Sequence, residues 1–593
     1  MRQARPSYPH FSTTSSPRAP ILPPEETLHA QELINPFEDN AIERIPTLTP
    51  PRHLENSEVN GYIKCRFHNF RHPSLAQTPY TVGLTHIPQA AHPRSTPSTM
   101  GRTLKSHHPP RTSSLISLVK CASIPSYSTT SNTSLFSALP QNPHSATESH
   151  VPRSPKHFGR KLKLSQSDGR LFMFYCNAWC AGRTILDSSN CWLVNIVQMA
   201  SSSKAVLHVI LALAGTYILD YLPDEGLRQR CNAHYNNAIG FLTQDLRDET
   251  EQRPGGGETI VAAIALLTMI DVVSPERRRC KNESPRWLEG ARVACRVLDA
   301  TDPGHRNWHV NNSQPSDARI ANTIIASRVV ILALPMMRLH KRNTDNNRFQ
   351  WLLLHSAEAT SRKVHGACGC SPRLLHMFAL ITNLAALIGD HHDSIFIPAS
   401  AEVIAQELDE HRQWSELKSE DHGSTEALLH ACDLRLNPQG VVTDKASMTD
   451  LTAEAWRLAA TIYLQCRFYR LPRSHPVVVL QMAYLAACIS RMPTSGSLFS
   501  AQAPLFPVFL LGLLAVRSEH DLCASHWFES VIRTSCRSSV PPLFEALKRI
   551  RLWMNAMIGP DEGAISEDIG KRHAWWEVMV ERVLDEEGIL CLV

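Results

Sequence analysis

The sequence predicts an all-α domain behind a disordered N-terminal segment, and three observations lead to this prediction. From about Leu171 onward, apolar residues recur at three- and four-residue spacing, which is the period of a buried helix face. The sequence shows no sustained strand alternation and no strand–helix repeat. Of the 40 prolines, 22 lie within residues 1–165. We therefore expect residues 1–167 to be disordered and residues 168–593 to form a large multi-helix domain.

The front segment is basic and rich in proline, serine and threonine. Residues 1–165 carry 18 Lys and Arg against 9 Asp and Glu, a net +9, so the +5 of the whole chain leaves −4 for the remainder. Such a segment cannot bury enough apolar surface to offset its ordering entropy. Its cations, among them Arg160, Lys161 and Lys163, would contact DNA weakly and without regard to base sequence. Met1 to Pro24 lacks the apolar stretch of a secretory signal.

Three helices stand out in the folded part. Val206 to Tyr217 is apolar on every side, which predicts a buried helix. The run "SPRWLEGARVACRVLDA" predicts a helix with Ser284 as N-cap and Pro285 at the first helical position. A third helix is predicted with Thr449 and Asp450 as available caps. Its apolar stripe consists of Leu451, Ala455, Leu458, Ile462, Cys466 and Tyr469.

The apolar runs are too short to predict a membrane protein. Ala205 to Leu219 is the most apolar run, and it falls below the roughly 20 residues that a membrane-spanning helix needs. Leu505 to Val516 is shorter still and contains a proline. We expect no transmembrane helix and no membrane partner.

The 16 cysteines predict core thiols rather than a metal site or disulfides. None belongs to a C-x-x-C pair, and most lie in apolar runs, which is typical of reduced thiols in a cytosolic or nuclear protein. Cys176, Cys180 and Cys191 are close together in "YCNAWCAGRTILDSSNCWL". A zinc site needs four ligands, and no fourth follows nearby. We expect a helix that ends near Cys180, a polar turn, and re-entry at Cys191.

Other polar motifs favour ordinary structural roles. Adjacent histidines in "GDHHDS", Gly389 to Ser394, would point in different directions, so a helix end or polar loop is expected. His208 is predicted to be a core histidine bonded to a carbonyl. "GAISEDIGK", Gly563 to Lys571, has glycines too far apart for a phosphate loop, and Arg572 stands where Ser or Thr should bind magnesium. Arg277 to Arg279 is either a nuclear signal or a solvated loop.

The usual catalytic patterns do not occur. The sequence contains no G-x-S-x-G, no H-E-x-x-H and no G-x-G-x-x-G. We assign no catalytic, cofactor-binding or metal-binding residue and predict no cofactor. Because the chain holds 29 histidines, an all-α enzyme with an unrecognised site stays open as an alternative.

An ordered set of segments resembles the regulatory domain of fungal-specific transcription factors, the middle homology region beside a zinc binuclear cluster. The resemblance covers Gly169 to Val593 and implies that one helix begins at His234–Tyr235, while Glu289 departs from the usual histidine. The matching segments are "NAWCAGRTILDSSNCWL", "MASSSKAVLHVILALAGTYILDYLP", "HYNNAIGFLTQDLRD", "ETIVAAIALLTMIDV", "RWLEGARVACRVLD", "AWRLAATIYLQCRFYRLPRSHPVV", "LFPVFLLGLLA" and "WWEVMVERV".

This resemblance implies a nuclear transcription regulator, with the helical domain restraining activation and contacting partners. The expected partners are related transcription factors, in a homo- or heterodimer, and the transcription machinery. Family members carry six cysteines in C-x2-C-x6-C spacing, whereas only Cys65 and Cys121 precede Cys176 here. The zinc cluster is missing, so DNA-binding residues stay unassigned and DNA contact is expected only indirectly or weakly. The cluster is encoded upstream, was lost, or is replaced by an intact partner.

Overall fold

A computed structural model describes the helical part of the chain. The described residues are 162–248, 255–273, 284–301, 316–339, 349, 351–354, 358–391, 394–417, 422–533, 538–559 and 568–593. The all-α prediction is confirmed, because helices dominate these residues and the β-type pairs among them are the isolated bridges Lys363–Trp414 and Leu436–Val442. Residues 1–161, most of the predicted disordered segment, lie outside the described residues.

The chain enters the fold through a helix that changes its winding. Ser165 begins α2 (Gln166–Phe174) by accepting a hydrogen bond from the Asp168 N–H at 3.2 Å. The helix continues as a π-helix, η3 (Tyr175–Trp179), so the chain leaves helical winding near Cys180 as predicted. Re-entry near Cys191 is also confirmed. The short elements of this region are η4 (Ala181–Arg183), η5 (Asp187–Ser189), η6 (Trp192–Ile196) and α3 (Val197–Met199).

The next two helices form a close pair. α4 (Lys204–Ile218) is buried on nearly every side, as its sequence predicts. α5 (Glu225–Arg247) begins at its Asp224 cap, whose carboxylate accepts from the Leu227 N–H at 2.7 Å. The expectation of a helix start at His234–Tyr235 is therefore wrong. An aspartate that satisfies an exposed N–H sets the start, and His234 lies in mid-helix.

The third group contains α6 (Glu258–Val273), α7 (Arg286–Ala300) and α8 (Asp317–Ala333). The predicted helix after Ser284 exists, but its start is one residue later than expected. Pro285 is the N-cap because its ψ of 147° is extended rather than helical. The Ser284 hydroxyl does not cap the helix, and it accepts a hydrogen bond from Arg292 Nη1 at 2.9 Å.

The remaining helices form the largest group. They are η7 (Leu334–Met336), α9 (Trp351–Leu354), α10 (Glu358–Ser361), α11 (Pro372–Asp390), α12 (Phe396–Glu410), α13 (Thr425–Asp433), α14 (Lys445–Tyr463), η8 (Leu464–Phe468), α15 (Pro476–Ser490), α16 (Leu505–Leu514), α17 (Ser518–Ile532), α18 (Val540–Met557), η9 (Ile569–Lys571) and α19 (Trp575–Glu586).

The predicted apolar stripe of α14 is confirmed, but its caps are not. Asp444 is the N-cap and accepts from the Ser447 N–H at 2.8 Å, so the helix starts before Thr449 and Asp450. Thr449 instead donates its hydroxyl to the Lys445 carbonyl at 2.7 Å. Cys466 lies in the π-helical continuation η8 and is fully buried.

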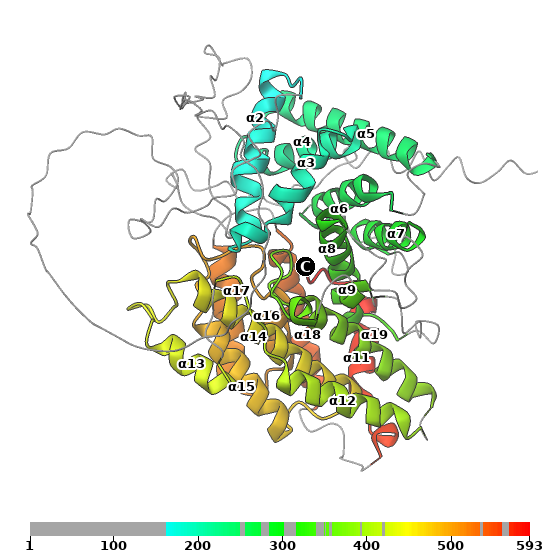
Figure 1. Cartoon of the computed structure of the whole chain (residues 1–593). Coiled ribbons are helices and arrows are strands. Elements are labelled where there is room, and N and C mark those ends of the chain that lie inside the picture. The colour runs from blue at the N-terminus through cyan, green and yellow to red at the C-terminus, as the bar shows by residue number, and fades with distance from the viewer. Residues whose placement is uncertain are drawn as a thin grey trace, which may run out of the picture.

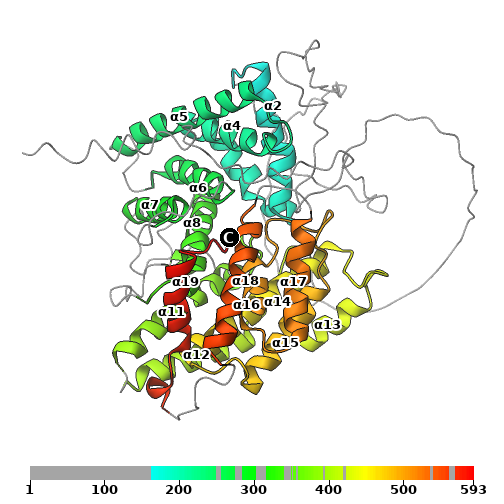
Figure 2. The ribbon, with the colours of Figure 1, turned by 180° about the vertical axis from the view of Figure 1, so that it is seen from behind.

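The helices are arranged in three neighbouring groups (Figure 1). α2, α4 and α5 lie at one end, α6 to α8 lie in the middle, and α11 to α18 fill the other end. The view from behind shows α19 beside α11 and α18, with the C-terminal residue close to the centre of the molecule (Figure 2). The three groups therefore meet around the last residues of the chain.

Among the residues that the structure describes, two helices are long and apolar enough to cross a membrane by length and composition alone. They are Asp317–Met336, which is 83% buried within the fold, and α11, which is 61% buried. Both pack against other helices, and this burial explains their composition as that of core helices. The apolar runs from which we expected no transmembrane helix, Ala205 to Leu219 and Leu505 to Val516, are shorter than these two helices.

Candidate functional site

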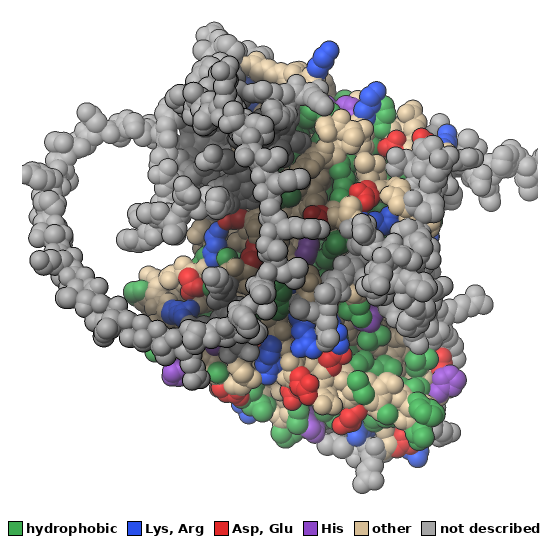
Figure 3. Space-filling view, in the orientation of Figure 1, with side chains coloured by type: hydrophobic (Ala, Val, Ile, Leu, Met, Phe, Trp, Pro, Cys, Tyr) green, Lys and Arg blue, Asp and Glu red, His purple; other side chains and the backbone are tan. Residues whose placement is uncertain are grey.

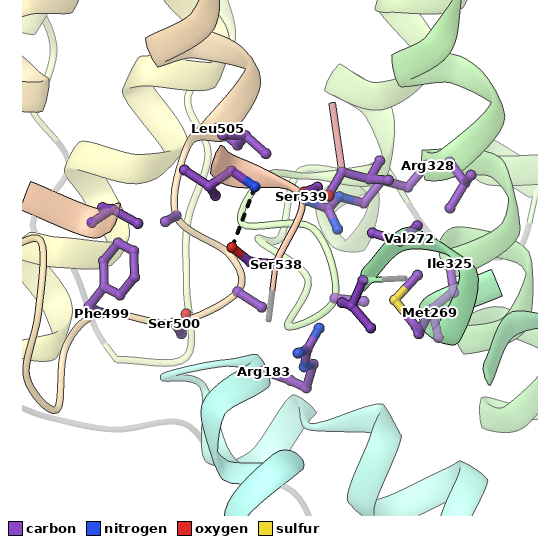
Figure 4. Close-up of a pocket in the computed structure, with 18 of the residues that line it drawn as sticks. Arg183, Met269, Val272, Ile325, Arg328, Phe499, Ser500, Leu505, Ser538 and Ser539 are labelled. Carbon is purple, nitrogen blue, oxygen red and sulfur yellow. Dashed lines mark hydrogen bonds between the residues drawn. The ribbon is translucent and has the colours of Figure 1, made fainter. Parts of the chain in front are cut away.

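A cavity of about 90 Å³ lies where the three groups of helices meet (Figure 4). Arg183 and Trp192 line it from the N-terminal group, and Arg328 lines it from α8. Phe499 and Trp527 come from the C-terminal group, and the last residue of the chain completes the wall. Its lining is mainly apolar and includes two guanidinium groups.

Aromatic rings hold Arg183 in place. Its guanidinium carbon lies 4.2 Å from the centre of the Trp179 ring, and Nη2 donates to the Tyr217 hydroxyl at 3.3 Å. Trp179 in turn stacks on Tyr175 at 4.9 Å and meets the edge of Trp192 at 5.2 Å. Tyr175 and Trp179 delimit the π-helical turn. Since they are four residues apart, this turn places both rings together in the core.

The three clustered cysteines, Cys176, Cys180 and Cys191, are neutral thiols buried in the same core. Burial raises the pKa of Cys176 and of Cys191 to about 12, and it also raises the pKa of Cys180. All three are free thiols and at most 5% exposed. Metal binding and nucleophilic chemistry require the thiolate, which these surroundings disfavour. In the described ranges, no group of three or more His, Cys, Asp or Glu could hold a metal ion.

Arg328 is a partly exposed arginine at the cavity wall. Within the described residues, its Nε is buried and has no hydrogen-bond partner, and no carboxylate forms an ion pair with it. Arg457 and Arg467, by contrast, are paired with Glu454 and Glu577.

A pair of thiols that the sequence patterns do not single out lies beside the cavity. Cys368 and Cys370 flank Gly369, which adopts a left-handed φ of 74°, and neighbouring Ala367 lines the cavity. The hydrogen bond from Cys370 and contact with His365 lower the pKa of Cys368, although burial opposes this. The same bond to Cys368 raises the pKa of Cys370. The C-x-C spacing was the available sequence signal.

His208 is not bonded to a carbonyl, contrary to the prediction. Its Nδ1 lies 2.9 Å from Nδ1 of His234, and His234 Nε2 lies 3.0 Å from Asp168 Oδ1. Burial alone would raise the pKa of Asp168, but hydrogen bonds from His234, Ser165 and Arg230 hold it well below its usual range. The partner of His208 lies on α5, and the sequence alone does not show how α5 packs against α4.

The other polar motifs are only partly described. In "GDHHDS", Asp390 ends α11 and His391 is its C-cap, as a helix end would require, while residues 392–393 lie outside the described part. The described end of "GAISEDIGK" forms η9, where Asp568 Oδ1 accepts from the Gly570 N–H at 2.9 Å. Arg277 to Arg279 also lies outside the described residues.

Comparison with known proteins agrees with the fold and the ordered segments. Residues 170–588 match the family model of the fungal specific transcription factor domain. No curated protein and no solved structure gives a match. The match takes in nearly all of the described helices, from α2 to α19. The chain belongs to the family of fungal-specific transcription factor domains.

Proposed function

We propose that the chain is a nuclear transcription regulator in which the helical domain that starts with α2 is the regulatory part and the segment before it is a disordered basic arm. The observation that supports it is the family match over residues 170–588. The central cavity adds a physical basis for regulation. Because all three groups of helices line it, a molecule bound there would act on the packing of all three.

We further propose that a partner brings this regulator to DNA. Only Cys65 and Cys121 precede Cys176 in the sequence, whereas the cluster of the family that the sequence resembles has six cysteines. The helical part is slightly acidic, and on the face in Figure 3 basic and acidic side chains are interspersed rather than gathered in a basic patch. These features suit a homo- or heterodimer with a related factor that reads DNA, with weak phosphate contacts from the basic arm.

An enzyme is the less favoured alternative. His208, His234 and Asp168 form a linked polar group, and none of the three lines the cavity. A catalytic site requires such groups to converge on a space that a substrate can occupy. The arrangement therefore favours a regulatory domain over a catalytic one.

Promoter occupancy in the native fungus tests the proposal. The full chain would be tagged at its own locus, and its cross-linking to chromatin compared with transcript changes after its deletion. We expect occupancy at promoters of genes whose transcripts change, and loss of that occupancy when a co-purifying related factor is deleted. Unchanged transcripts together with a uniform chromatin profile would refute a regulatory role. Occupancy that persists without any partner would refute delivery by a partner.

A further inference from the structure

A short loop before α11 brings two thiols together. In this loop the N–H groups of Cys368 and Gly369 donate to the His365 carbonyl at 3.0 and 3.1 Å. The His365 N–H in turn donates to the Cys370 carbonyl at 3.1 Å, which closes the turn. The side chains of Cys368 and Cys370 form a hydrogen bond with each other. The two thiols are therefore held as neighbours without a covalent bond.

Two glycines let this loop pack between distant parts of the chain. Gly369 has a φ of 74°, in the left-handed region that other residues rarely adopt. A Cβ on Gly369 would lie 2.9 Å from the main-chain oxygen of Gln502. A Cβ on Gly366 would overlap the main-chain oxygen of Ser189. The loop is therefore seated between the N-terminal group of helices and the segment that leads into α16.

The surroundings of Cys368 favour its thiolate form. The hydrogen bond from Cys370 lowers the pKa of Cys368, and contact with His365 lowers it further, although burial opposes both. The Ala367 N–H donates to His365 Nδ1 at 3.1 Å, so the neutral ring keeps its hydrogen on Nε2 as a donor. Cys176 is the opposite case, because burial raises its pKa to about 12. The thiolate is the form that oxidants attack.

Two cavities border the loop on either side of Cys368. Ala367 lines the central cavity of about 90 Å³, and Gly369 lines a second cavity of about 10 Å³ together with Gln502. A cavity needs roughly 10–15 Å³ to hold one water, so the central cavity has room for hydrogen peroxide. Cys368 and Cys370 are only 1% and 2% exposed, which protects them from larger reagents.

We propose that Cys368 and Cys370 form a reversible disulfide in response to hydrogen peroxide. The Cys368 thiolate attacks one peroxide oxygen, and the O–O bond breaks to give a sulfenic acid and a hydroxide, which takes up a proton. The Cys370 sulfur then attacks the Cys368 sulfur, which forms the S–S bond and breaks the S–O bond. The departing hydroxide leaves as a second water with the Cys370 proton. The sulfurs lose two electrons to the peroxide, and a cellular dithiol reverses the step by thiol–disulfide exchange.

This disulfide would change how the groups of helices meet. An S–S bond is shorter than a hydrogen bond between thiols and has its own dihedral preference, so the turn must adjust. Gln502 Nε2 donates to the His365 carbonyl at 3.2 Å, and Gln502 Oε1 accepts from the Thr184 hydroxyl at 2.8 Å. Ser371, the N-cap of α11, directly follows Cys370. The regulatory meaning of these shifts rests on the proposed function, whereas the disulfide itself does not.

Mass spectrometry of the full chain tests the thiol pair. Trypsin cleaves after Lys363 and Arg373, so both thiols lie on one peptide without any other cysteine. The reduced chain would be treated with equimolar hydrogen peroxide, denatured, alkylated and digested. We expect this peptide to lose two hydrogens and escape alkylation at a rate about tenfold or more above the oxidation of Cys176 and Cys180. Dithiothreitol should restore the alkylation of both thiols.

Single substitutions separate the roles of the two thiols. Cys370→Ser should stop the reaction at the Cys368 sulfenic acid, which dimedone labels, and Cys368→Ser should abolish oxidation of the peptide. Cys523→Ser, which removes a thiol on α17, should change neither result. In the unsubstituted chain, a peptide that stays reduced, or a disulfide from Cys368 to Cys191 instead, would overturn the proposal.

Transcripts in peroxide-treated cells separate this inference from the proposed function. We expect the genes that depend on the chain to respond to peroxide with the unsubstituted chain and not with Cys368→Ser. If the disulfide forms but the two chains give the same transcripts, its regulatory meaning is refuted and the thiol pair stands. If the chain regulates transcripts while the peptide stays reduced, the thiol pair is refuted and the proposed function stands.

Discussion

Arg467 and Glu577 form a two-point ion pair between η8 and α19. Nε of Arg467 lies 2.9 Å from Oε1 of Glu577, and Nη2 lies 3.0 Å from Oε2. The same guanidinium donates to the main-chain carbonyls of Leu334 and Met337, both at 2.8 Å, and its side chain is fully buried. One side chain therefore joins the end of α8, the π-helical end of α14 and the last helix.

Replacing Arg467 with Met should destabilise the fold strongly. The variant would leave Glu577 without its partner and two main-chain carbonyls without donors, at an expected cost of about 3–5 kcal/mol. Thermal unfolding of the full chain measures this loss. Lys548→Ala is the matched control, because Lys548 and Glu545 form an exposed pair worth about 0–1 kcal/mol. Equal effects of the two substitutions would contradict a structural role for Arg467.

Gly215 allows the close contact of α4 with α5. A Cβ at this position would overlap the Sγ atom of Cys231, which is buried. Gly215→Ala should therefore cost about 1–3 kcal/mol, and adding Cys231→Ala should recover much of it. Gly240→Ala is the opposite case, since nothing lies within 4 Å of its Cβ on the exposed side of α5. It should stabilise the protein by about 0.5–1 kcal/mol. If Gly215→Ala leaves the Tm unchanged, α4 and α5 are not as closely packed as this contact requires.

Two buried histidines predict a loss of stability in mild acid. Burial, together with nearby arginines, lowers the pKa of His376 and of His411 to about 4. The unfolded chain takes up these protons at about pH 6.5, before the folded chain does. Stability should therefore fall as the pH drops from about 6.5 to 4, by up to about 3 kcal/mol for each group.

Unfolding of variants between pH 7 and pH 4 tests this dependence. His376→Leu and His411→Gln should each reduce the acid-induced fall in Tm, and the double variant should reduce it most. His411 Nε2 lies 2.9 Å from Ser371 Oγ, which caps α11. The Tm of His411→Gln at pH 7 therefore also measures any stability that is lost with this contact. The exposed His430→Gln should leave the pH profile unchanged. An identical profile for all variants would exclude these histidines as the cause.

The clustered cysteines should resist modification in the native chain. Burial keeps Cys176, Cys180 and Cys191 protonated, and alkylation requires an accessible thiolate. Mass spectrometry after brief iodoacetamide treatment should find them unmodified until denaturant is added. Elemental analysis should find no stoichiometric zinc on the purified chain. Tightly held zinc would restore these cysteines as candidate ligands.

DNA affinity should come from the basic arm and depend on salt rather than sequence. The substitution of Arg160, Lys161 and Lys163 by Gln should weaken binding equally on unrelated duplexes. Each lost phosphate contact should make the slope of log affinity against log salt less steep by about 0.9. Fluorescence anisotropy at several salt concentrations measures both quantities. Strong preference of the unsubstituted chain for one duplex would reveal a DNA-reading element that its sequence does not suggest.

The sequence predicts which segments become helices better than where they start. The apolar stripe of α14 is visible in the residues because core burial imposes its period, yet its start depends on the single hydrogen bond that Asp444 accepts. Pro285 likewise takes the cap position because of one extended backbone angle. Such local choices between neighbouring polar residues leave little periodic signal.

The candidate site could not be predicted in this way. Arg183 and Arg328 are far apart in the chain, and they meet only because the three groups of helices close around one cavity. The pairing of His208 with His234 depends in the same way on how α4 lies against α5. Spacing within one segment indicates a shared helix face, but contacts between distant helices depend on the complete packing.

Tethering the full chain to a promoter tests whether the chain regulates transcription. The chain would be fused to an unrelated DNA-binding domain and placed at a reporter that carries the matching site. We expect a clear change in reporter transcript relative to the DNA-binding domain alone, and no change with the unfused chain. If the fusion is expressed and folded at the level of the DNA-binding domain alone and the transcript is unchanged, the chain is not a transcription regulator of the proposed kind.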